Sequence, residues 1–231
     1  MNHEYVKPWF KFFNEPIADE KAVVQDGNYR FTVLTSRLIR MEYAYDQVFE
    51  DRPSQTFWYR KQEVPPFSVE KDDKTFTIET DHLILTYNYK SKFSGSSLKI
   101  KLKDTKKTWK FGMKDRGNLK GTSRTLDGTN GFSILEKGLM STNGFTVLDD
   151  SKTLVFNEDY WLEPRMEKKK RNIDMYFFGH GSDYLGCLVD YYKVSGKTPM
   201  IPRYILGNWW SRYWEYDEKE LKELINNFKL H

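Results

Sequence analysis

Cysteine and histidine are scarce in this sequence, and their scarcity excludes several kinds of site. The 231 residues include a single cysteine, Cys187, so neither an internal disulfide nor a cysteine-based zinc cluster can form. Cys187 lies in the apolar stretch 184–189, which favours a small buried side chain over a nucleophile. The histidines are scattered and indicate no metal site: they are His3, His82, His180 and His231.

Long apolar runs and a strong charge imbalance are also missing. No stretch is long enough to span a bilayer, and residues 1–10 lack the apolar core of a signal peptide, so we expect a cytoplasmic protein without a membrane partner. The 37 basic and 33 acidic residues leave a net charge of +4. This near balance predicts no strong attraction to nucleic acid or to an acidic membrane.

Aromatic residues, by contrast, are abundant. They make up 16% of the sequence and include 7 Trp and 15 Tyr. Such a composition is typical of β-sandwich cores and also of surfaces that stack on sugars or bases. Core packing is the simpler explanation for most of these rings, including Trp209 and Trp210.

Alternation of apolar and polar residues predicts many short antiparallel strands with one solvated face. Ile39, Met41 and Tyr43, for example, alternate with Arg40 and Glu42. The other strand-like segments lie at 31–33, 76–78, 83–89, 98–102, 146–148, 153–156 and 173–178. This succession of short strands indicates a β-sandwich.

Three further segments complete the sandwich prediction. Residues 112–144 are rich in Gly and Asn, which predicts several short strands joined by tight turns. The charge run 167–171 is expected to form a solvated hairpin tip, and residues 183–192 are expected to form a short helix that packs over the sandwich.

The C-terminal part of the sequence has a different pattern. Asp217 and Glu220 have the spacing of a capping box, and residues 204–210 form an apolar run of strand length. An apolar stripe at helical spacing follows the cap: Leu221, Leu224, Ile225 and Phe228. Strand, polar turn and amphipathic helix predict one β/α unit of a parallel sheet. We therefore expect a sandwich domain over residues 1–198 and the start of a second domain over residues 199–231.

Five motifs in the second half of the chain resemble, in the same order, the N-terminal region of glycoside hydrolase family 31. They cover roughly residues 115–231, whereas residues 1–114 agree with the family only in strand pattern. The motifs are NLKGTSRTLDG at 118–128, GLMSTNGFTVLDDS at 138–151, DMYFFGHGSDY at 174–184, SGKTPMIPR at 195–203 and GNWWSRYWEY at 207–216.

The resemblance implies a mainly β fold, namely a galactose-mutarotase-like antiparallel β-sandwich followed by the first β/α unit of a truncated (β/α)8 barrel. It also implies a retaining α-glycosidase that hydrolyses α-glucosides or α-xylosides of oligosaccharides and needs no cofactor. The family's two catalytic aspartates come from later barrel strands. We therefore expect no catalytic residue in this sequence, an inactive fragment, and the remainder of the barrel as its partner.

The adjacent acidic residues Asp149 and Asp150 are a candidate carboxylate pair in the second motif. Neighbouring residues of a strand point to opposite faces, whereas retaining chemistry needs two carboxyl groups about 5 to 5.5 Å apart across the scissile bond. We expect Asp149 and Asp150 to hold turns and loops instead.

The resemblance places one group of substrate-binding residues after the first barrel strand. Tyr213, Trp214 and Tyr216 are expected to form an apolar wall against the sugar ring, because family members line the site with an aromatic residue from this turn. Arg212 is expected to hydrogen-bond a sugar hydroxyl or to hold a carboxylate. This chain has six residues in 211–216 where many relatives have five. The alternative role for the group is packing between sandwich and barrel.

A second group consists of Arg124 and Asp127 in the Gly-rich loop. Family members can extend loops of this domain toward the substrate, which makes both residues candidates for substrate binding. The alternative is an internal ion pair that braces the turn.

Two other functions and one assembly state remain open. The sandwich alone can act as a carbohydrate-binding module without catalysis, provided that exposed coplanar rings line one sheet face. The basic stretch 99–110 has the composition of a nucleic-acid contact, but alternating lysines are also typical of the solvated face of an edge strand, and we expect no nucleic-acid partner. An exposed C-terminal stripe would also favour a homo-oligomer.

Overall fold

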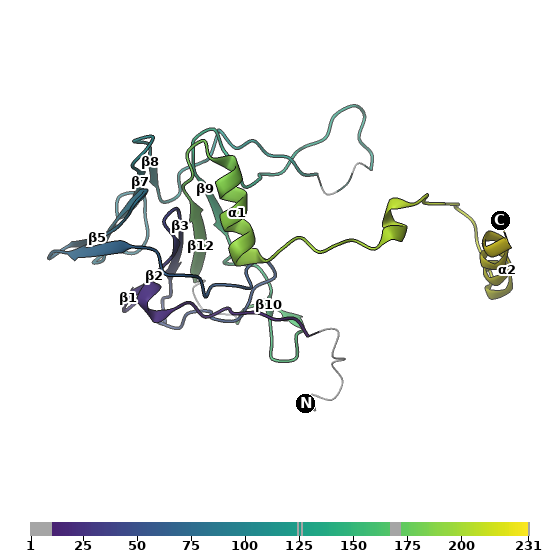
Figure 1. Cartoon of the computed structure of the whole chain (residues 1–231), viewed down its shortest axis with the longest axis horizontal. Coiled ribbons are helices and arrows are strands. Elements are labelled where there is room, and N and C mark those ends of the chain that lie inside the picture. The colour runs from purple at the N-terminus through teal and green to yellow at the C-terminus, as the bar shows by residue number, and fades with distance from the viewer. Residues whose placement is uncertain (1–10, 124, 126, 167–171, 231) are drawn as a thin grey trace. The chain divides into compact units, whose positions relative to one another are not determined.

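The computed structural model describes residues 11–123, 125, 127–166 and 172–230. The chain divides into two compact units, residues 1–197 and residues 198–231, which are treated separately below (Figure 1). The first unit is mainly β, with antiparallel sheets, and the second contains a short 3-10 turn and one α-helix.

Two five-stranded antiparallel sheets form the first unit. The first sheet has the order β1-β2-β3-β12-β9, and the second is a consecutive meander from β4 to β8. A 3-10 turn, η3 (Glu20–Ala22), precedes the first sheet, whose strands are β1 (Val23–Asp26), β2 (Tyr29–Thr35), β3 (Leu38–Tyr43), β9 (Thr146–Asp149) and β12 (Ile173–Phe178). The second sheet contains β4 (Phe67–Lys71), β5 (Thr75–Thr80), β6 (Leu83–Asn88), β7 (Leu98–Leu102) and β8 (Thr108–Lys110), and a small hairpin joins β10 (Val155–Phe156) to β11 (Leu162–Glu163).

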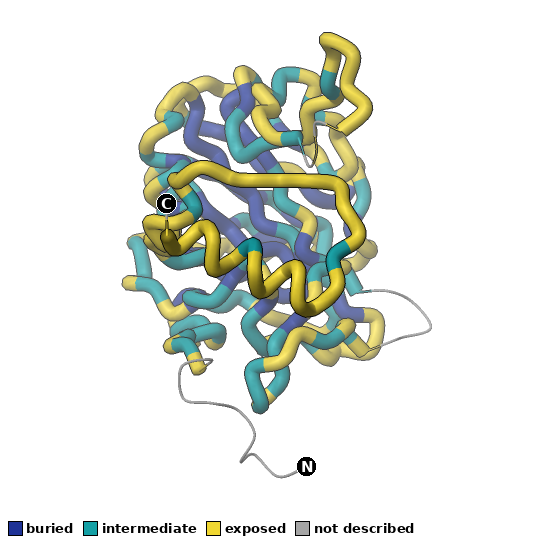
Figure 2. Tube along the Cα trace, turned by 90° about the vertical axis from the view of Figure 1, so that its right-hand side faces the viewer, coloured by how far each residue is buried: buried dark blue, intermediate teal, exposed yellow. Residues whose placement is uncertain are grey.

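The main core lies between the two sheets. Alternate residues of each strand enter it, such as Phe31 and Val33 of β2 and Leu98, Ile100 and Leu102 of β7, all of which are fully buried. Figure 2 shows the buried residues of the chain in dark blue. The predicted β-sandwich and its main strands are therefore confirmed.

The outer face of the first sheet is covered by α1 (Tyr184–Ser195), which confirms the expected helix but begins one residue and ends three residues later than predicted. The Asp183 carboxylate accepts the Gly186 N–H and caps the helix N-terminus. A second apolar cluster fills the space between α1 and the sheet: Leu34, Leu38, Phe57, Tyr176, Phe178, Cys187 and Val194. Burial, with smaller effects of Asp190 and Asp183, raises the pKa of Cys187 to about 12, which agrees with the expected inert thiol.

The strands expected within residues 112–144 are wrong for the described part of that segment. It contains only two isolated bridges, Asn118 with Ser141 and Thr122 with Glu136. Side chains hold this segment instead of a strand ladder, because Asn118 and Asp115 hydrogen-bond to residues 138–143. The charge run 167–171 lies outside the described residues.

The second unit confirms the predicted helix and corrects the predicted strand. Helix α2 (Glu218–Leu230) begins with a reciprocal capping box: Glu220 N–H donates to Asp217 Oδ1 at 2.7 Å, and Asp217 N–H donates to Glu220 Oε2 at 3.3 Å. The run 204–210 is not a strand, since it begins with a 3-10 turn, η4 (Arg203–Leu206), and continues irregularly. A parallel strand needs a hydrogen-bonded neighbour, and no strand occurs in the described residues of this unit.

Burial in the second unit also differs from one expectation. Trp209 and Trp210 were expected in a core, but 72% and 50% of their surfaces are exposed. Their partners include residues nearby in the sequence and in α2: Trp209 Nε1 donates to the Ile205 carbonyl, and the Trp210 ring meets Phe228 edge-on. The apolar stripe of α2 lacks a buried residue as well.

Gly144 is a testable position of the fold. Its φ of +80° favours glycine, and a Cβ there would lie 3.0 Å from the Gly181 backbone, whose N–H donates to the Gly144 carbonyl. Gly112 has nearly the same φ, +79°, but open space around it. We expect Gly112→Ala to cost about 1 kcal/mol of unfolding free energy from backbone strain, and Gly144→Ala to cost clearly more, as measured by urea denaturation. Equal costs would show that the contact with Gly181 adds nothing.

Candidate functional site

A cluster of buried charges lies on the outer face of the first sheet, beside the area that α1 covers. Asp174 of β12 is paired in register with Glu42 of β3, and Tyr176 is paired with Arg40. The Arg40 guanidinium binds both oxygens of Asp174 at 2.8 Å and reaches Glu42 at 3.0 Å. Arg30 of β2 binds Glu42 through two further bonds of 2.6 and 2.8 Å. Alternating charges on three neighbouring strands thus neutralise one another.

Arg165 extends this cluster to a second carboxylate. Its guanidinium donates to Asp174 at 2.9 Å and to Asp150 at 2.7 Å. Asp150 also accepts a hydrogen bond from the Ser54 hydroxyl at 3.2 Å. The expected role of Asp149 and Asp150 is borne out, because Asp150 joins loops while Asp149 accepts the Ser151 N–H and hydroxyl within a turn.

The two carboxylates that share Arg165 have opposite pKa shifts. Burial and the neighbouring charge of Asp174 raise the pKa of Asp150 to about 6, against the opposing effect of Arg165. Burial alone would also raise the pKa of Asp174, but Arg40 and Arg165 hold that pKa well below its usual range. Burial raises the pKa of Glu42 despite its contacts with Arg40 and Arg30.

These contacts show that the prediction of a solvated face for this sheet is wrong at Arg40 and Glu42. Arg40 and Glu42 were expected to face water, but each is only 2% exposed. Their face is covered by distant segments: Arg40 also donates to the Glu50 carbonyl, and Arg165 donates to the Thr153 carbonyl. The sequence carried one signal of this arrangement, because residues 30, 40, 42 and 174 are oppositely charged and lie in strand-like segments. Which of these charges pair with each other can be known only from the order of the strands in the sheet.

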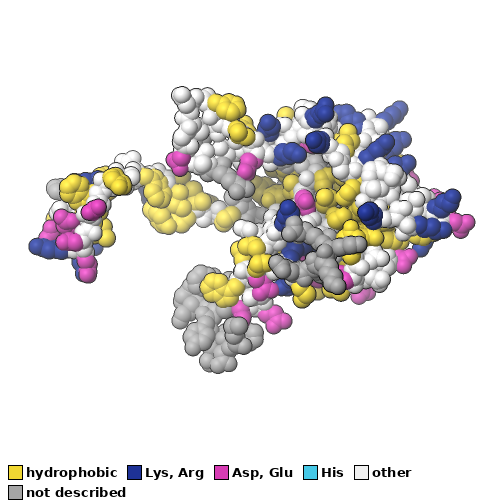
Figure 3. All heavy atoms as spheres, turned by 180° about the vertical axis from the view of Figure 1, so that it is seen from behind, with side chains coloured by type: hydrophobic (Ala, Val, Ile, Leu, Met, Phe, Trp, Pro, Cys, Tyr) yellow, Lys and Arg dark blue, Asp and Glu magenta, His cyan; other side chains and the backbone are white. Residues whose placement is uncertain are grey.

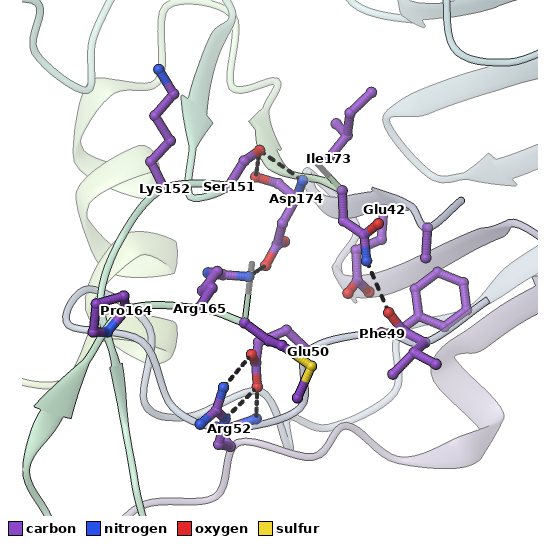
Figure 4. Close-up of a pocket in the computed structure, with 14 residues that line it drawn as sticks. Glu42, Phe49, Glu50, Arg52, Ser151, Lys152, Pro164, Arg165, Ile173 and Asp174 are labelled. Atoms are coloured by element: carbon purple, nitrogen blue, oxygen red, sulfur yellow. Dashed lines mark hydrogen bonds and ion pairs between the residues drawn. The ribbon is translucent and has the colours of Figure 1, made fainter. Parts of the chain in front are cut away.

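A pocket of about 560 Å³ opens next to the charge cluster (Figure 4). Glu42 and Asp174 line it from the sheet, and Arg165 lies against Asp174 with its other nitrogens bound elsewhere. Arg52, at another wall, is bound to Glu50 and Glu163. Ser151, Lys152, Phe49 and Met166 also line the pocket, and sequence reasoning did not predict it.

The pocket has the chemistry of a structural brace rather than of a glycosidase centre. Arg165 stands between Asp150 and Asp174 and binds both, so the two carboxylates do not face a shared open space as the pair of a retaining glycosidase does. Asp150 does not line the pocket. The carboxylates of this site therefore hold β3, β12 and the covering loops together.

The motifs of the first unit that resemble glycoside hydrolase family 31 contact one another. Asn118 of the first motif exchanges two hydrogen bonds with Gly138 of the second, at 2.8 and 2.9 Å. Asp115, just before the first motif, accepts hydrogen bonds from Ser141 and Asn143 of the second. The Gly144 carbonyl then accepts the N–H of Gly181 in the third. Three segments that are distant in sequence thus form one hydrogen-bonded cluster, which we call the motif clasp.

The predicted sugar-binding residues of the second unit are largely exposed. The Arg212 guanidinium lies 4.3 Å from the centre of the Trp214 ring, which itself is 55% exposed. Tyr213 is fully exposed, whereas Tyr216 is half-buried. The structure therefore brings Arg212 and Trp214 together, and the role of all four residues in sugar binding stays a prediction.

The second predicted group is described only in part. Arg124 lies outside the described residues, so its expected ion pair with Asp127 stays a prediction. Asp127 is exposed, and its N–H donates to the Thr125 hydroxyl.

Two other features concern the described residues only. Within them, no three His, Cys, Asp or Glu side chains are grouped so as to hold a metal ion. Neither helix in the same part of the chain has the length and apolar character that a membrane span requires.

Asp174 and Asp150, which share Arg165, should differ in how much their charge contributes to stability, and this difference can be tested. We expect Asp174→Asn to cost about 3–5 kcal/mol of unfolding free energy at neutral pH, because it leaves the guanidinium groups of buried Arg40 and half-buried Arg165 short of negative charge. Asp150→Asn should cost at most about 2 kcal/mol, because ionisation of Asp150 is itself unfavourable in the fold. Urea denaturation of both variants, with the exposed Glu70→Gln as control, measures the difference. Equal losses would contradict it.

The raised pKa of Asp150 also predicts a pH dependence. Between about pH 4 and about pH 6 the folded chain binds a proton that the unfolded chain releases, so this contribution to stability is full below about pH 4 and is lost as the pH rises through about 6. Asp150→Asn removes the titrating group. The unfolding free energy of the wild type relative to Asp150→Asn should therefore be greater at about pH 4.5 than at pH 7 in denaturation at both values. A difference that stays constant, or that grows with pH, would refute the assignment.

Solved structures of a glycoside hydrolase are similar to this chain. No family model and no curated protein matches the sequence. Two solved structures of a GH31 dextranase from Flavobacterium johnsoniae are similar to the chain, one a variant complexed with isomaltotriose and the other complexed with glucose. Each has 17% sequence identity and a TM-score of 0.48, and the matches cover 78% and 80% of this chain. They cover 27% and 28% of the dextranase chains, so this chain spans little more than a quarter of their length.

Proposed function

We propose that this chain supplies the N-terminal β-sandwich and the beginning of the catalytic barrel of a family 31 α-glycosidase. The whole enzyme would hydrolyse α-glucosides or α-xylosides of oligosaccharides with retention of configuration. The observation that carries the proposal is the set of five family motifs, in family order, over residues 115–231. We place the domain boundary at residues 198/199.

The motif clasp supports this proposal. Segments selected in the sequence for their resemblance to one family are also hydrogen-bonded to one another, through Asn118 and Gly138 and through Gly144 and Gly181. Such contacts give the motifs a physical reason to occur together, because a change in one segment removes partners from the next.

Catalysis in the proposed enzyme would depend on two aspartates from later barrel strands. One would attack the anomeric carbon to form a covalent glycosyl-enzyme, and the other would protonate the leaving oxygen and then activate water. The present chain would contribute binding. The exposed rings of Tyr213 and Trp214 provide apolar faces for a sugar ring, and Arg212 provides donors for a hydroxyl or a carboxylate.

A non-catalytic carbohydrate-binding function is the second candidate. Large exposed rings, such as Trp161 at 67% and Tyr213 at 106% relative exposure, are the residues from which sugar-stacking surfaces are built. This function predicts that the chain alone binds an oligosaccharide, whereas the first predicts that substrate binding needs the barrel.

Release of nitrophenol from α-glucoside and α-xyloside substrates tests the first proposal. We expect no turnover by this chain, because Asp150 and Asp174 are held by Arg165, and turnover by a form extended through the whole barrel. The stereochemistry of the first product, followed by NMR, should show retention.

Turnover by the short form would refute the assignment of catalysis to the barrel. If neither form is active, calorimetric titration of the short form with isomaltotriose separates the two candidates. Binding that is lost in Trp161→Ala or Tyr213→Ala would favour the carbohydrate-binding module, and absence of binding would speak against both functions.

A further inference from the structure

The near balance of charge over the whole chain conceals a strong local excess. Residues 90–114 contain nine lysines and no arginine, and their only acidic residue is Asp104. This segment therefore has a net charge of +8, although the whole chain has +4. It comprises β7, β8 and the loops around them. Eight of the nine lysines are exposed, and Lys103 is half-buried.

The strand register gathers part of this charge on one face. Leu98, Ile100 and Leu102 of β7 face the core, so Lys99 and Lys101 between them face outward. Lys110 of β8 lies directly opposite Lys99. We call the outward surface formed by Lys99, Lys101 and Lys110 the lysine face. Figure 3 shows Lys and Arg side chains gathered on this part of the first unit.

Neighbouring strands do not neutralise the lysine face. Across β6, the positions opposite Lys99 and Lys101 are occupied by Thr86 and Ile84. The nearest acidic strand positions on this side, Glu79 of β5 and Glu70 of β4, lie beyond them, and Glu79 is bound to Lys103. Like charges placed directly opposite each other destabilise a sheet. Lys99 and Lys110 therefore repel each other, and an anionic partner that binds this surface would relieve the repulsion.

The chemistry of the face indicates which kind of anion. Arginine is the residue that recognises single phosphates or carboxylates through paired bonds, whereas lysine acts as a hydrated point charge. Base stacking needs exposed rings, but Trp109 of β8 is 3% exposed and belongs to the core. An open sheet face that carries only lysine charges fits a broad, diffuse layer of negative charge better than a defined polymer site.

We propose that the lysine face docks on the surface of a membrane rich in anionic lipids. The attraction is electrostatic and needs no inserted segment, so it does not depend on a membrane-spanning helix. The net charge of the chain predicted no such partner, but the clustering of lysines in β7 and β8 changes that prediction. The binding is independent of the glycosidase function proposed above.

Vesicle sedimentation with the full chain tests the proposal. The probes are phosphatidylcholine vesicles with and without phosphatidylserine, at low salt and at about 0.15 M salt. We expect binding only to the vesicles that contain phosphatidylserine, and weaker binding at the higher salt. Each lysine near an anionic surface contributes about fivefold in affinity, so the triple variant K99Q/K101Q/K110Q should bind about a hundredfold more weakly.

The matched control removes the same charge elsewhere. Lys21, Lys137 and Lys197 are exposed and have no ion-pair partner among the described residues, so K21Q/K137Q/K197Q keeps the lysine face intact. It should retain most of the binding. Thermal unfolding checks that the face variant is folded, which we expect because it relieves the repulsion between Lys99 and Lys110.

Three results would overturn the proposal. The first is an absence of vesicle binding at low salt, and the second is an equal loss in both triple variants, which would reduce the effect to net charge. The third is tighter binding of single-stranded DNA or of an acidic polysaccharide than of the vesicles, with the same sensitivity to K99Q/K101Q/K110Q. That result would assign the face to an anionic polymer.

Discussion

The paired hydrogen bonds between Arg40 and Asp174 are the interaction on which the first unit most depends. They join β3 to β12, strands that lie side by side in the middle of the first sheet, and each end of the pair binds a further charge. Such a buried pair adds little net stability compared with an apolar pair of the same shape, yet loss of one partner is costly. The Arg40–Asp174 pair instead specifies that β3 lies next to β12 and that the loop of Arg165 packs on both strands.

The covering of this pair also explains why one sheet has two buried faces. The inner face packs against the second sheet, while α1 and the loops that carry Glu50, Ser54 and Arg165 cover the outer face. Apolar residues fill the part under α1, and ion pairs fill the part under the loops. The pocket beside Asp174 lies in the part that loops and ion pairs cover.

Local patterns allowed much of this fold to be predicted. Alternation located the main strands, and the capping residue Asp217 marked the start of α2. The sequence failed where partners come from far away. Alternation alone gives Arg40 and Glu42 a polar face. Only the pairing with Asp174 of β12 and the contacts of the Glu50 and Arg165 loops show that this face is buried. The strand predicted at 204–210 is wrong for another reason. The described residues of its unit contain no neighbouring strand, and a strand pattern cannot form a hydrogen-bonded ladder without one.

The candidate site also has parts that the sequence could suggest and parts that only the structure reveals. Resemblance to a family made Arg212 and the rings after it candidates for substrate binding, which stays a prediction. No periodicity could locate the pocket, whose walls come from segments around residues 42, 50, 152, 165 and 174. The lysines of β7 were visible in the sequence as a solvated strand face. Their significance depends on Lys110 in the next strand and on the uncharged residues across β6, which only the strand register reveals.

The order of strands has a consequence for how the chain is made. The second sheet is a meander in which each strand pairs with the next, so it can assemble as soon as β8 is complete. The first sheet cannot close until β12 arrives to fill the place between β3 and β9. Contacts that close long loops form late because their entropy must be paid first. During synthesis, β3 therefore has one unpaired edge until β12 has been made. While residues 44–172 are being added, a chaperone or a second chain can pair with that edge.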